Sequence, residues 1–487
     1  MIQKFLSKYG LSVHLAVLAA LPLALTPFLT AATLGSVILW LSAFVAVWLF
    51  TEPSLRRGEH ISSSRVRLRH ELVRDPFFWF LLIVLVYALV RWLNSGIATI
   101  YNPEQGEWLV RNPPWAGFPG STAAGGFLPW CTALATTLVV LGLRNAVGAS
   151  ARVTFGVVGA FVAGLGGLVA ASCACAGIKF FAEATKAGFE QAPFWASSFG
   201  VWLVVGIVSG AAAESVKWSF ARIPYIFGVA GNLAALVFFA PPLVAVAWLL
   251  VAAGALAFSL VYVSRTSSMG AVTRCGVLVA FGMSIPVFMI MTFMPQGFMD
   301  FKSMNLNPGV AFPETYASMS ESLTRIAKSM WLSHPWFGVG EGAFPLHLPF
   351  LAEKADWAVL PVKPEFATNG LLMVLAERGV FGVLLMALGL GMLIVFYVLN
   401  LIGGHNWHRR RDEGAPFIFS VPPAAWVLPF AMLPFVPEMF FSPILNGPTF
   451  ILTAVVPLAL SASSFPRGRL SSASTAKNSE SSSHPEK

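Results

Sequence analysis

The side chains of this chain that could bind anions or transfer protons gather in one polar segment, residues 294–370, between hydrophobic runs. Seven acids and five Lys or Arg residues lie in this segment. Arg325 is its only arginine, and His347 and Glu365 follow it. A guanidinium pairs with anionic oxygens, and an imidazole or a carboxylate accepts a proton. These residue types predict chemistry on a polar substrate.

Residues 314–332 within the segment have the pattern of an amphipathic helix. Apolar side chains recur at alternating spacings of three and four residues and form a single stripe, made by Tyr316, Met319, Leu323, Ile326 and Met330. Pro313 suits the first helical turn, and Pro335 ends the helix. Arg325 lies off the stripe.

The sequence SHPWFGVGEGAF, residues 333–344, follows the predicted helix directly. Its three alternating glycines are Gly338, Gly340 and Gly342. Glycine at this density permits unusual backbone angles and lets a ligand, such as an anionic headgroup, approach the main-chain N–H groups closely. A tight turn that only joins two elements would have the same composition, so the turn alone leaves both interpretations open.

The elements that must position these residues are membrane-spanning helices. Hydrophobic residues make up 56% of the chain and charged residues 11%, and the mean hydropathy is +0.73, well outside soluble usage. We predict an all-α, polytopic integral membrane protein. Pro241 and Pro242 divide one long run into two helices, because proline disrupts a helix interior. The twelve apolar runs are 11–31, 33–50, 76–96, 126–146, 153–175, 196–213, 223–240, 243–263, 275–293, 371–402, 417–436 and 445–463.

Basic loops predict the orientation, because Lys and Arg in short loops stay on the cytoplasmic side. Six arginines lie in 52–75 and three in 403–416. Both termini are therefore expected inside, and 97–125, 176–195 and 294–370 outside. The net charge of +9 reflects this topology and does not indicate nucleic-acid binding. The expected units are helices 1–9 (1–293), a large periplasmic loop (294–370), helices 10–12 (371–463) and a disordered Ser-rich cytoplasmic tail (464–487).

The sequence shows no pattern for a metal or a cofactor. The four cysteines lie in or beside the predicted spans, at Cys131, Cys173, Cys175 and Cys275. Cys173 and Cys175 could suggest a metal or redox pair, but the further ligands of a zinc site do not accompany them. We interpret the cysteines as small apolar packing residues, and we expect neither a metal nor another cofactor.

A second motif, ATNGLLMVLAERGVFG at 367–382, completes a recognisable pair. The two motifs together resemble those of the O-antigen ligase and polymerase family of bacterial envelope glycosyltransferases. The first pattern is matched by Pro335, Gly338, Gly340 and Phe344, and the second by Ala367, Asn369, Leu372, Glu377, Gly379 and Gly382. The resemblance covers about residues 314–385. The histidine that this family carries before the asparagine is Thr368 here, and threonine is not a base near neutral pH.

The resemblance implies transfer of a glycan from undecaprenyl diphosphate to a hydroxyl at the periplasmic face of the inner membrane. The acceptor, a growing glycan, lipid A-core or another hydroxyl compound, stays open, as does the choice between ligation, polymerisation and protein glycosylation. Arginines would stabilise the diphosphate as it leaves. Arg325 is the first candidate, with Arg378 and Arg91 as further binders. Gly338, Gly340 and Asn369 would contact the substrate.

Each of these assignments has an alternative. Arg91 could extend to the lipid headgroups, and Arg378 could pair with Glu377. The acceptor base could be Glu365, Glu377 or His347, although Glu377 could also brace the re-entering helix. A transporter or flippase of lipid-linked sugar is the alternative function. Against it stand the single large loop and the lack of paired half-repeats or broken helices.

Overall fold

The computed structural model describes residues 2–51, 75–102, 106–115, 117–145, 149–175, 192–215, 222–240, 242–266, 313–358, 369–409, 423–427, 429–434 and 448–463, with the single positions 73, 272, 276, 280 and 367. These residues are mostly helical, and the two strands among them form one hairpin. Glu365, Thr368 and Cys275 lie outside the described residues.

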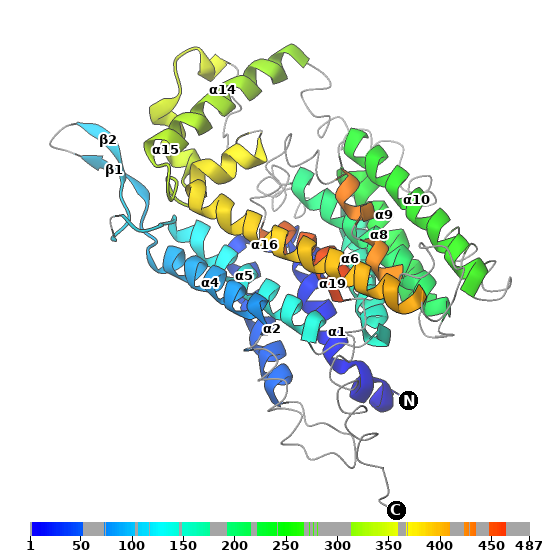
Figure 1. The fold of residues 1–487 in the computed structure, drawn as a ribbon. Helices are drawn as coiled ribbons and strands as arrows, with labels where there is room; N and C mark the ends of the chain where they lie inside the picture. Colours follow the sequence, from blue (N-terminus) through cyan, green and yellow to red (C-terminus); the bar gives the residue numbers. More distant parts are fainter. Residues whose placement is uncertain are drawn as a thin grey trace, which may run out of the picture.

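Apolar helices form a bundle that makes up most of the described chain (Figure 1). They are α1 (Ile2–Leu25), α2 (Ala31–Thr51), α4 (Pro76–Leu93), α5 (Ala123–Asn145), α6 (Ala149–Cys175), α8 (Ala192–Ser215), α9 (Arg222–Phe239), α10 (Pro242–Thr266), α16 (Gly370–Arg409) and α19 (Pro448–Ser463), with the short turn η3 (Pro423–Trp426). The helix break predicted at the paired prolines is present, because α9 ends at Phe239 and α10 begins at Pro242.

Five of the described helices, α4, α5, α6, α10 and α16, contain stretches that are long and apolar enough to cross a membrane. Shorter apolar stretches lie in α1, α2, α8 and α9. The predicted all-α class is therefore confirmed, and the helices are compatible with a multi-pass membrane protein. The count of twelve spans stays a prediction.

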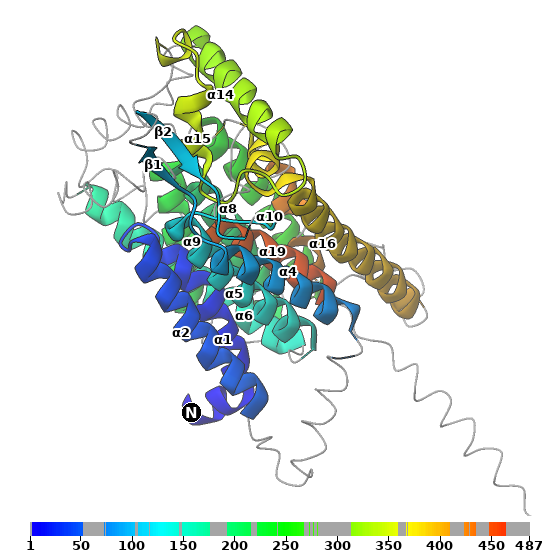
Figure 2. The ribbon, with the colours of Figure 1, turned by 90° about the vertical axis from the view of Figure 1, so that its left-hand side faces the viewer.

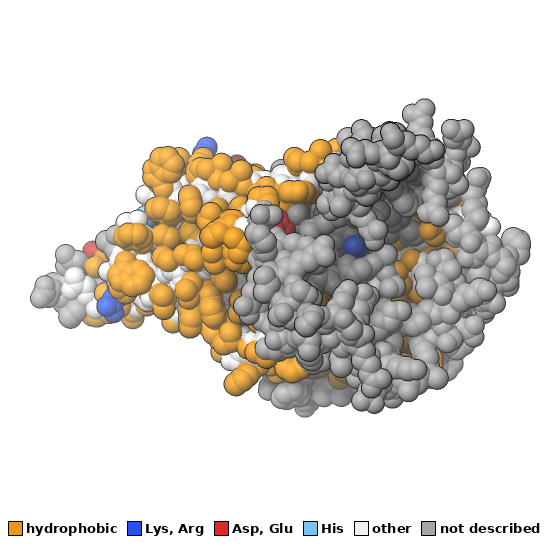
Figure 3. All heavy atoms as spheres, turned by 60° about the horizontal axis from the view of Figure 1, so that its bottom comes forward, with side chains coloured by type: hydrophobic (Ala, Val, Ile, Leu, Met, Phe, Trp, Pro, Cys, Tyr) orange, Lys and Arg blue, Asp and Glu red, His pale blue; other side chains and the backbone are white. Residues whose placement is uncertain are grey.

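The outer surface of the bundle is apolar. On α4 and α16, large side chains such as Trp79, Ile83, Leu388 and Val395 are about half exposed or more, and hydrophobic side chains cover most of the described surface in Figure 3. Soluble monomers rarely expose so large a continuous apolar area. This is the surface that lipid would cover.

Helices α4 and α16 run antiparallel beside each other. The rings of Phe77 and Phe396 are 5.2 Å apart near one end, and those of Tyr87 and Phe381 are 5.2 Å apart near the other. The C-terminus of α4 therefore lies next to the N-terminal part of α16. This is the end of the bundle at which the polar residues gather.

A cap of loops and short elements covers that end (Figures 1 and 2). We use the word cap for the described residues of 94–122 and 313–358, two segments that the sequence predicts on the same side. It contains β1 (Ala98–Asn102) antiparallel to β2 (Glu107–Arg111), α14 (Pro313–Ser333), α15 (Phe344–Leu351) and the turn η2 (Asp356–Ala358).

Helix α14 corresponds to the predicted amphipathic helix, and the described side chains of its stripe are buried or partly buried. Leu323, Ile326 and Met330 are each at most 2% exposed and form a second core, separate from that of the bundle. Phe344 of α15 and Met373 of α16 belong to the same core. The cap is therefore packed onto the start of α16.

Candidate functional site

Helix α16 is broken near its N-terminal end. Gly379 has φ 64° and ψ −171° inside the helix, a backbone conformation that glycine adopts without steric penalty. A break in a helix leaves carbonyls before it and N–H groups after it without intrahelical partners. These groups must find other partners if they are buried.

The glycine-rich turn supplies those partners. Its main chain both donates to the freed carbonyls and accepts from the freed N–H groups, so the turn and the break form one joint. The four hydrogen bonds are Val339 N to Ala376 O (2.8 Å), Gly340 N to Glu377 O (3.1 Å), Val380 N to Pro335 O (2.8 Å) and Phe381 N to Trp336 O (3.1 Å).

The glycines allow this close approach. Gly338, Gly340 and Gly342 have φ of 70°, 108° and 72°, and a Cβ on Gly338 would lie 2.4 Å from the carbonyl carbon of Glu377. The N–H of Gly338 donates to His334 O (2.9 Å) and that of Gly340 to α16. The geometry supports the structural interpretation of the turn, and a direct contact of Gly338 or Gly340 with a ligand stays a prediction.

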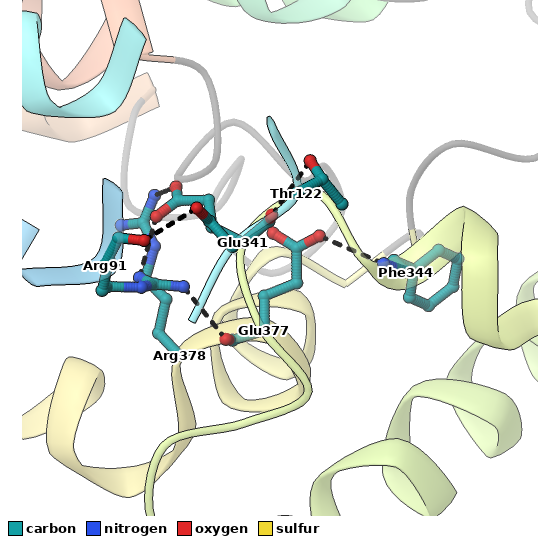
Figure 4. Close-up of polar contacts among 7 residues, drawn as sticks. Arg91, Thr122, Glu341, Phe344, Glu377 and Arg378 are labelled. Carbon is teal, nitrogen blue, oxygen red and sulfur yellow. Dashed lines mark hydrogen bonds and ion pairs between the residues drawn. The ribbon is translucent and has the colours of Figure 1, made fainter. Parts of the chain in front are cut away.

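Two arginines from different helices meet at this joint (Figure 4). Arg91, in the last turn of α4, and Arg378, in α16, both form ion pairs with Glu341 of the glycine turn. Arg91 Nη1 lies 2.8 Å from Glu341 Oε2, and Arg378 Nη2 donates to Glu341 Oε1. The three side chains are 4% to 10% exposed. Arg91 therefore turns inward and does not extend to lipid headgroups.

Some hydrogen-bond donors of the cluster have no partner among the described residues. Arg91 Nη2 donates to the main-chain oxygen of Glu377 (3.2 Å), but the buried Nε atoms of Arg91 and Arg378 find no hydrogen-bond partner among the described residues. Burial alone would raise the pKa of Glu341, but the charges of Arg378 and Arg91 bring that pKa below its usual value. Glu341 is thus a carboxylate, shared by two cations.

The start of α5 anchors the same cluster. Ser121 Oγ donates to Arg91 O (2.8 Å), Thr122 N donates to Glu341 O (3.0 Å), and Glu341 N donates to Gly120 O (3.2 Å). Glu341 was counted only as one acid of the polar segment and was not predicted as a site residue. The available signal was its place as the only acid inside the glycine-rich turn.

Asn369 lies immediately before α16, and Glu377 lies inside this helix, shortly before the break at Gly379. Glu377 is 4% exposed, and its Oε1 accepts a hydrogen bond from Phe344 N at the start of α15 (3.4 Å), which is a bracing contact. Asn369 Oδ1 accepts from Leu372 N (3.0 Å), so Asn369 caps the helix. Among the described residues, Arg378 forms its ion pair with Glu341 and not with Glu377.

Arg325 lies in a different, exposed cluster. From α14 it forms ion pairs with Glu353 (2.6 Å) and with Asp356 of η2. Its side chain is 43% exposed. The hydrogen bond from Arg325 lowers the pKa of Asp356 below its usual value. Both contacts fasten α14 to the segment that follows α15, and a role of Arg325 in binding an anion stays a prediction.

His347 lies on α15 and is partly buried. Burial, followed by the charge of His334, lowers the pKa of His347 to about 4. Its imidazole is therefore neutral near pH 7 and is available as a proton acceptor.

The described residues contain no cluster of His, Cys, Asp or Glu side chains that could hold a metal ion. Cys131 is buried and Cys173 partly buried, each against the core of the bundle, as expected for packing residues.

Comparisons with known proteins add no assignment: no protein-family model matches the chain, and no curated protein matches it significantly. The candidate site is therefore defined by its own geometry, two arginines from α4 and α16 that meet at a carboxylate of the glycine-rich turn.

Proposed function

We propose that this protein is a twelve-span inner-membrane glycosyltransferase that moves a glycan from an undecaprenyl-diphosphate donor to an acceptor hydroxyl at the periplasmic face. The observation that carries the proposal is the arginine pair, Arg91 and Arg378. The pair lies where the apolar bundle meets the cap, which is where the headgroup of a lipid-linked donor would lie. Residues 294–370 and the cap are assigned to the periplasm, and both termini to the cytoplasm.

The arginine pair fits the electrostatic demand of this reaction. The acceptor oxygen attacks the anomeric carbon, the bond from that carbon to the diphosphate breaks, and negative charge grows on the departing lipid diphosphate. Cationic hydrogen-bond donors held in place before the reaction stabilise such charge most effectively. The Nε–H groups of Arg91 and Arg378 have no hydrogen-bond partner within the described part of the chain, and diphosphate oxygens would accept from them.

A base must take the proton of the acceptor hydroxyl as the oxygen of that hydroxyl attacks the anomeric carbon. Among the described candidates we assign it to Glu377, because this residue precedes Arg378 in the same turn of α16 and its side chain faces the start of α15. His347 is the second described candidate, and its lowered pKa keeps it neutral. Glu365 lies outside the described residues.

Transfer from purified lipid-linked donor, measured in proteoliposomes at matched amounts of folded protein, tests the proposal. Arg91→Lys and Arg378→Lys should each lose about 10- to 100-fold in kcat/KM, because an ammonium cannot reproduce the planar fork of a guanidinium. Lys328→Ala, an exposed site on α14, should match the wild type. Transfer that is undiminished in both arginine variants would remove the pair from the reaction.

One observation favours the rival function, transport of lipid-linked sugar without chemistry. Transporters also contain broken helices, and α16 is broken at Gly379, contrary to the expectation from the sequence. In transporters, however, the freed helix ends face the substrate, whereas here the glycine turn occupies them. Movement of labelled lipid-linked sugar across vesicles, with no glycosyl product in the presence of acceptor, would establish transport instead.

Cysteine labelling in intact cells tests the assigned sides, after replacement of the four native cysteines. Ser329 is exposed on α14, and Ser264 is exposed near the C-terminus of α10, which the predicted topology places in the cytoplasm. A membrane-impermeant thiol reagent should label Ser329→Cys and should not label Ser264→Cys. The reverse pattern would place the cap in the cytoplasm and exclude a periplasmic reaction.

A further inference from the structure

Glu341 occupies a singular position among the acids of the described cap. Its two carboxylate oxygens are divided between two guanidinium groups, Oε2 to Arg91 and Oε1 to Arg378. These arginines belong to helices α4 and α16, which are also joined at this end by the hydrogen bond from Arg91 Nη2 to Glu377 O (3.2 Å) and by the contact between the rings of Tyr87 and Phe381. The Glu341 side chain is therefore the direct charged link between the two cations.

We propose that Glu341 is a positioning residue, which holds Arg91 and Arg378 side by side so that both guanidinium groups face one diphosphate. This inference rests on the proposed function, and it assigns Glu341 no contact with substrate. Glu341 acts through the arginines that it orients.

The backbone of Glu341 is suited to this task because it is fixed on both sides. Its N–H donates to Gly120 O and its carbonyl accepts from Thr122 N, both at the start of α5. On either side stand Gly340 and Gly342, with positive φ. The carboxylate thus projects from a rigid point, and the buried environment strengthens its attraction for both arginines.

The neutral alternative to Glu341 could not hold the pair. Without the Glu341 carboxylate, the two buried guanidinium groups lose the acceptor that they share. Their mutual repulsion then favours a turn of each toward another acceptor or toward water. Arg91 would still be held by Glu377 O (3.2 Å). The Arg378 guanidinium makes no other hydrogen bond within the described part of the chain, so Arg378 should lose its orientation first.

The test compares Glu341→Gln with Glu341→Asp in proteoliposomes, at matched folded protein. Glu341→Gln keeps the shape and removes the charge, and we expect kcat at saturating donor to fall by about 10- to 100-fold. Inhibition by inorganic pyrophosphate, used as a probe of the arginine pair, should weaken by a similar factor. Glu341→Asp keeps the charge but reaches less far, and it should show a loss of about three- to tenfold in both measurements.

The matched control is Glu353→Gln, which also removes one carboxylate from an arginine ion pair, but at an exposed site. It should leave both kcat and pyrophosphate inhibition at wild-type values. A purely structural role for Glu341 predicts a different result: less folded protein, with kcat and pyrophosphate inhibition per folded molecule unchanged in both Glu341 variants. That result would overturn the inference.

If Glu341→Gln does not fold, Glu341→Asp decides the question alone. The proposal requires a carboxylate that reaches both arginines, so wild-type kcat and wild-type pyrophosphate inhibition in Glu341→Asp would contradict it. Failure of the proposed function looks different. In that case the wild type transfers no glycan, whereas direct binding of pyrophosphate to the wild type and to Glu341→Asp still shows whether Glu341 positions an anion site.

Discussion

Two arginine clusters in this protein use the same chemistry in opposite surroundings. Arg91 and Arg378 share one carboxylate, Glu341, in the interior, where their side chains are 4% and 10% exposed. Arg325 pairs with two carboxylates nearer the surface, where its own side chain is 43% exposed, that of Glu353 70% and that of Asp356 6%. Among the described ion pairs, two guanidinium groups share one carboxylate in the buried cluster, whereas one guanidinium meets two carboxylates in the exposed cluster.

The difference shows why the type of a residue and its position in the chain do not by themselves identify an anion site. Charges attract more strongly in a low effective dielectric, and water screens a surface pair. A guanidinium that is paired with two carboxylates also attracts a diphosphate less strongly than one that shares a single carboxylate with another guanidinium. On both grounds the buried pair is the better anion site.

The largest effect should come from breaking the joint that brings the buried cluster together, without changing any charge. Gly338→Ala places a Cβ 2.4 Å from Glu377 C at a φ of 70°. We expect a loss of roughly 3 kcal/mol in unfolding free energy, from backbone strain and overpacking combined, together with loss of transfer. Thermal unfolding in detergent measures the first effect.

Gly117→Ala is the matched control for that substitution. Gly117 also has a positive φ, 83°, but nothing lies within 4 Å of its added Cβ. It should therefore show the strain alone, about 1 kcal/mol. Equal destabilisation by the two variants would show that the close contact between the turn and α16 contributes nothing.

A smaller effect should come from pH, through His347 on α15. Its folded-state pKa of about 4 lies below the ordinary value of 6.5, so the unfolded chain binds more protons between these values. Stability should therefore be full above about pH 6.5 and fall as the pH is lowered toward 4, by about 2 kcal/mol after allowance for partial exposure.

His347→Gln should flatten that pH dependence when chemical unfolding is followed between pH 4 and pH 7. His334→Asn, at an exposed site, should keep most of the slope. A slope that persists unchanged in His347→Gln would assign the dependence to another group.

The smallest effect is expected at the exposed cluster. Arg325→Ala should leave transfer within about twofold of the wild type, because the assigned anion site lies elsewhere and the pair of Arg325 with Glu353 is exposed and contributes little. The same proteoliposome assay, with Lys328→Ala as the control, measures it. A loss of 10-fold or more would return the diphosphate to Arg325, as the sequence alone predicts, and would reverse the ranking of the two clusters.

The sequence by itself determined the features that depend on composition and short-range periodicity. Hydropathy predicted apolar helices, and Pro241 and Pro242 predicted the division between α9 and α10. The stripe of α14 predicted which side chains of that helix would be buried. Spacing within a helix dictates which residues share a face, so Leu323, Ile326 and Met330 could be grouped without a partner in view. Glycine density also marked the turn at 338–342.

Only the tertiary structure decided what these elements meet. Arg91 and Glu377 are 286 positions apart, and no local pattern pairs them. The sequence showed the glycines of the turn, but it did not show that they let the turn pack against the backbone of α16. The break at Gly379 is stable only where another chain segment satisfies the freed N–H and carbonyl groups. Glu341 likewise looked like one acid among seven. Its role follows from burial between two helices, and burial is a property of the packed fold.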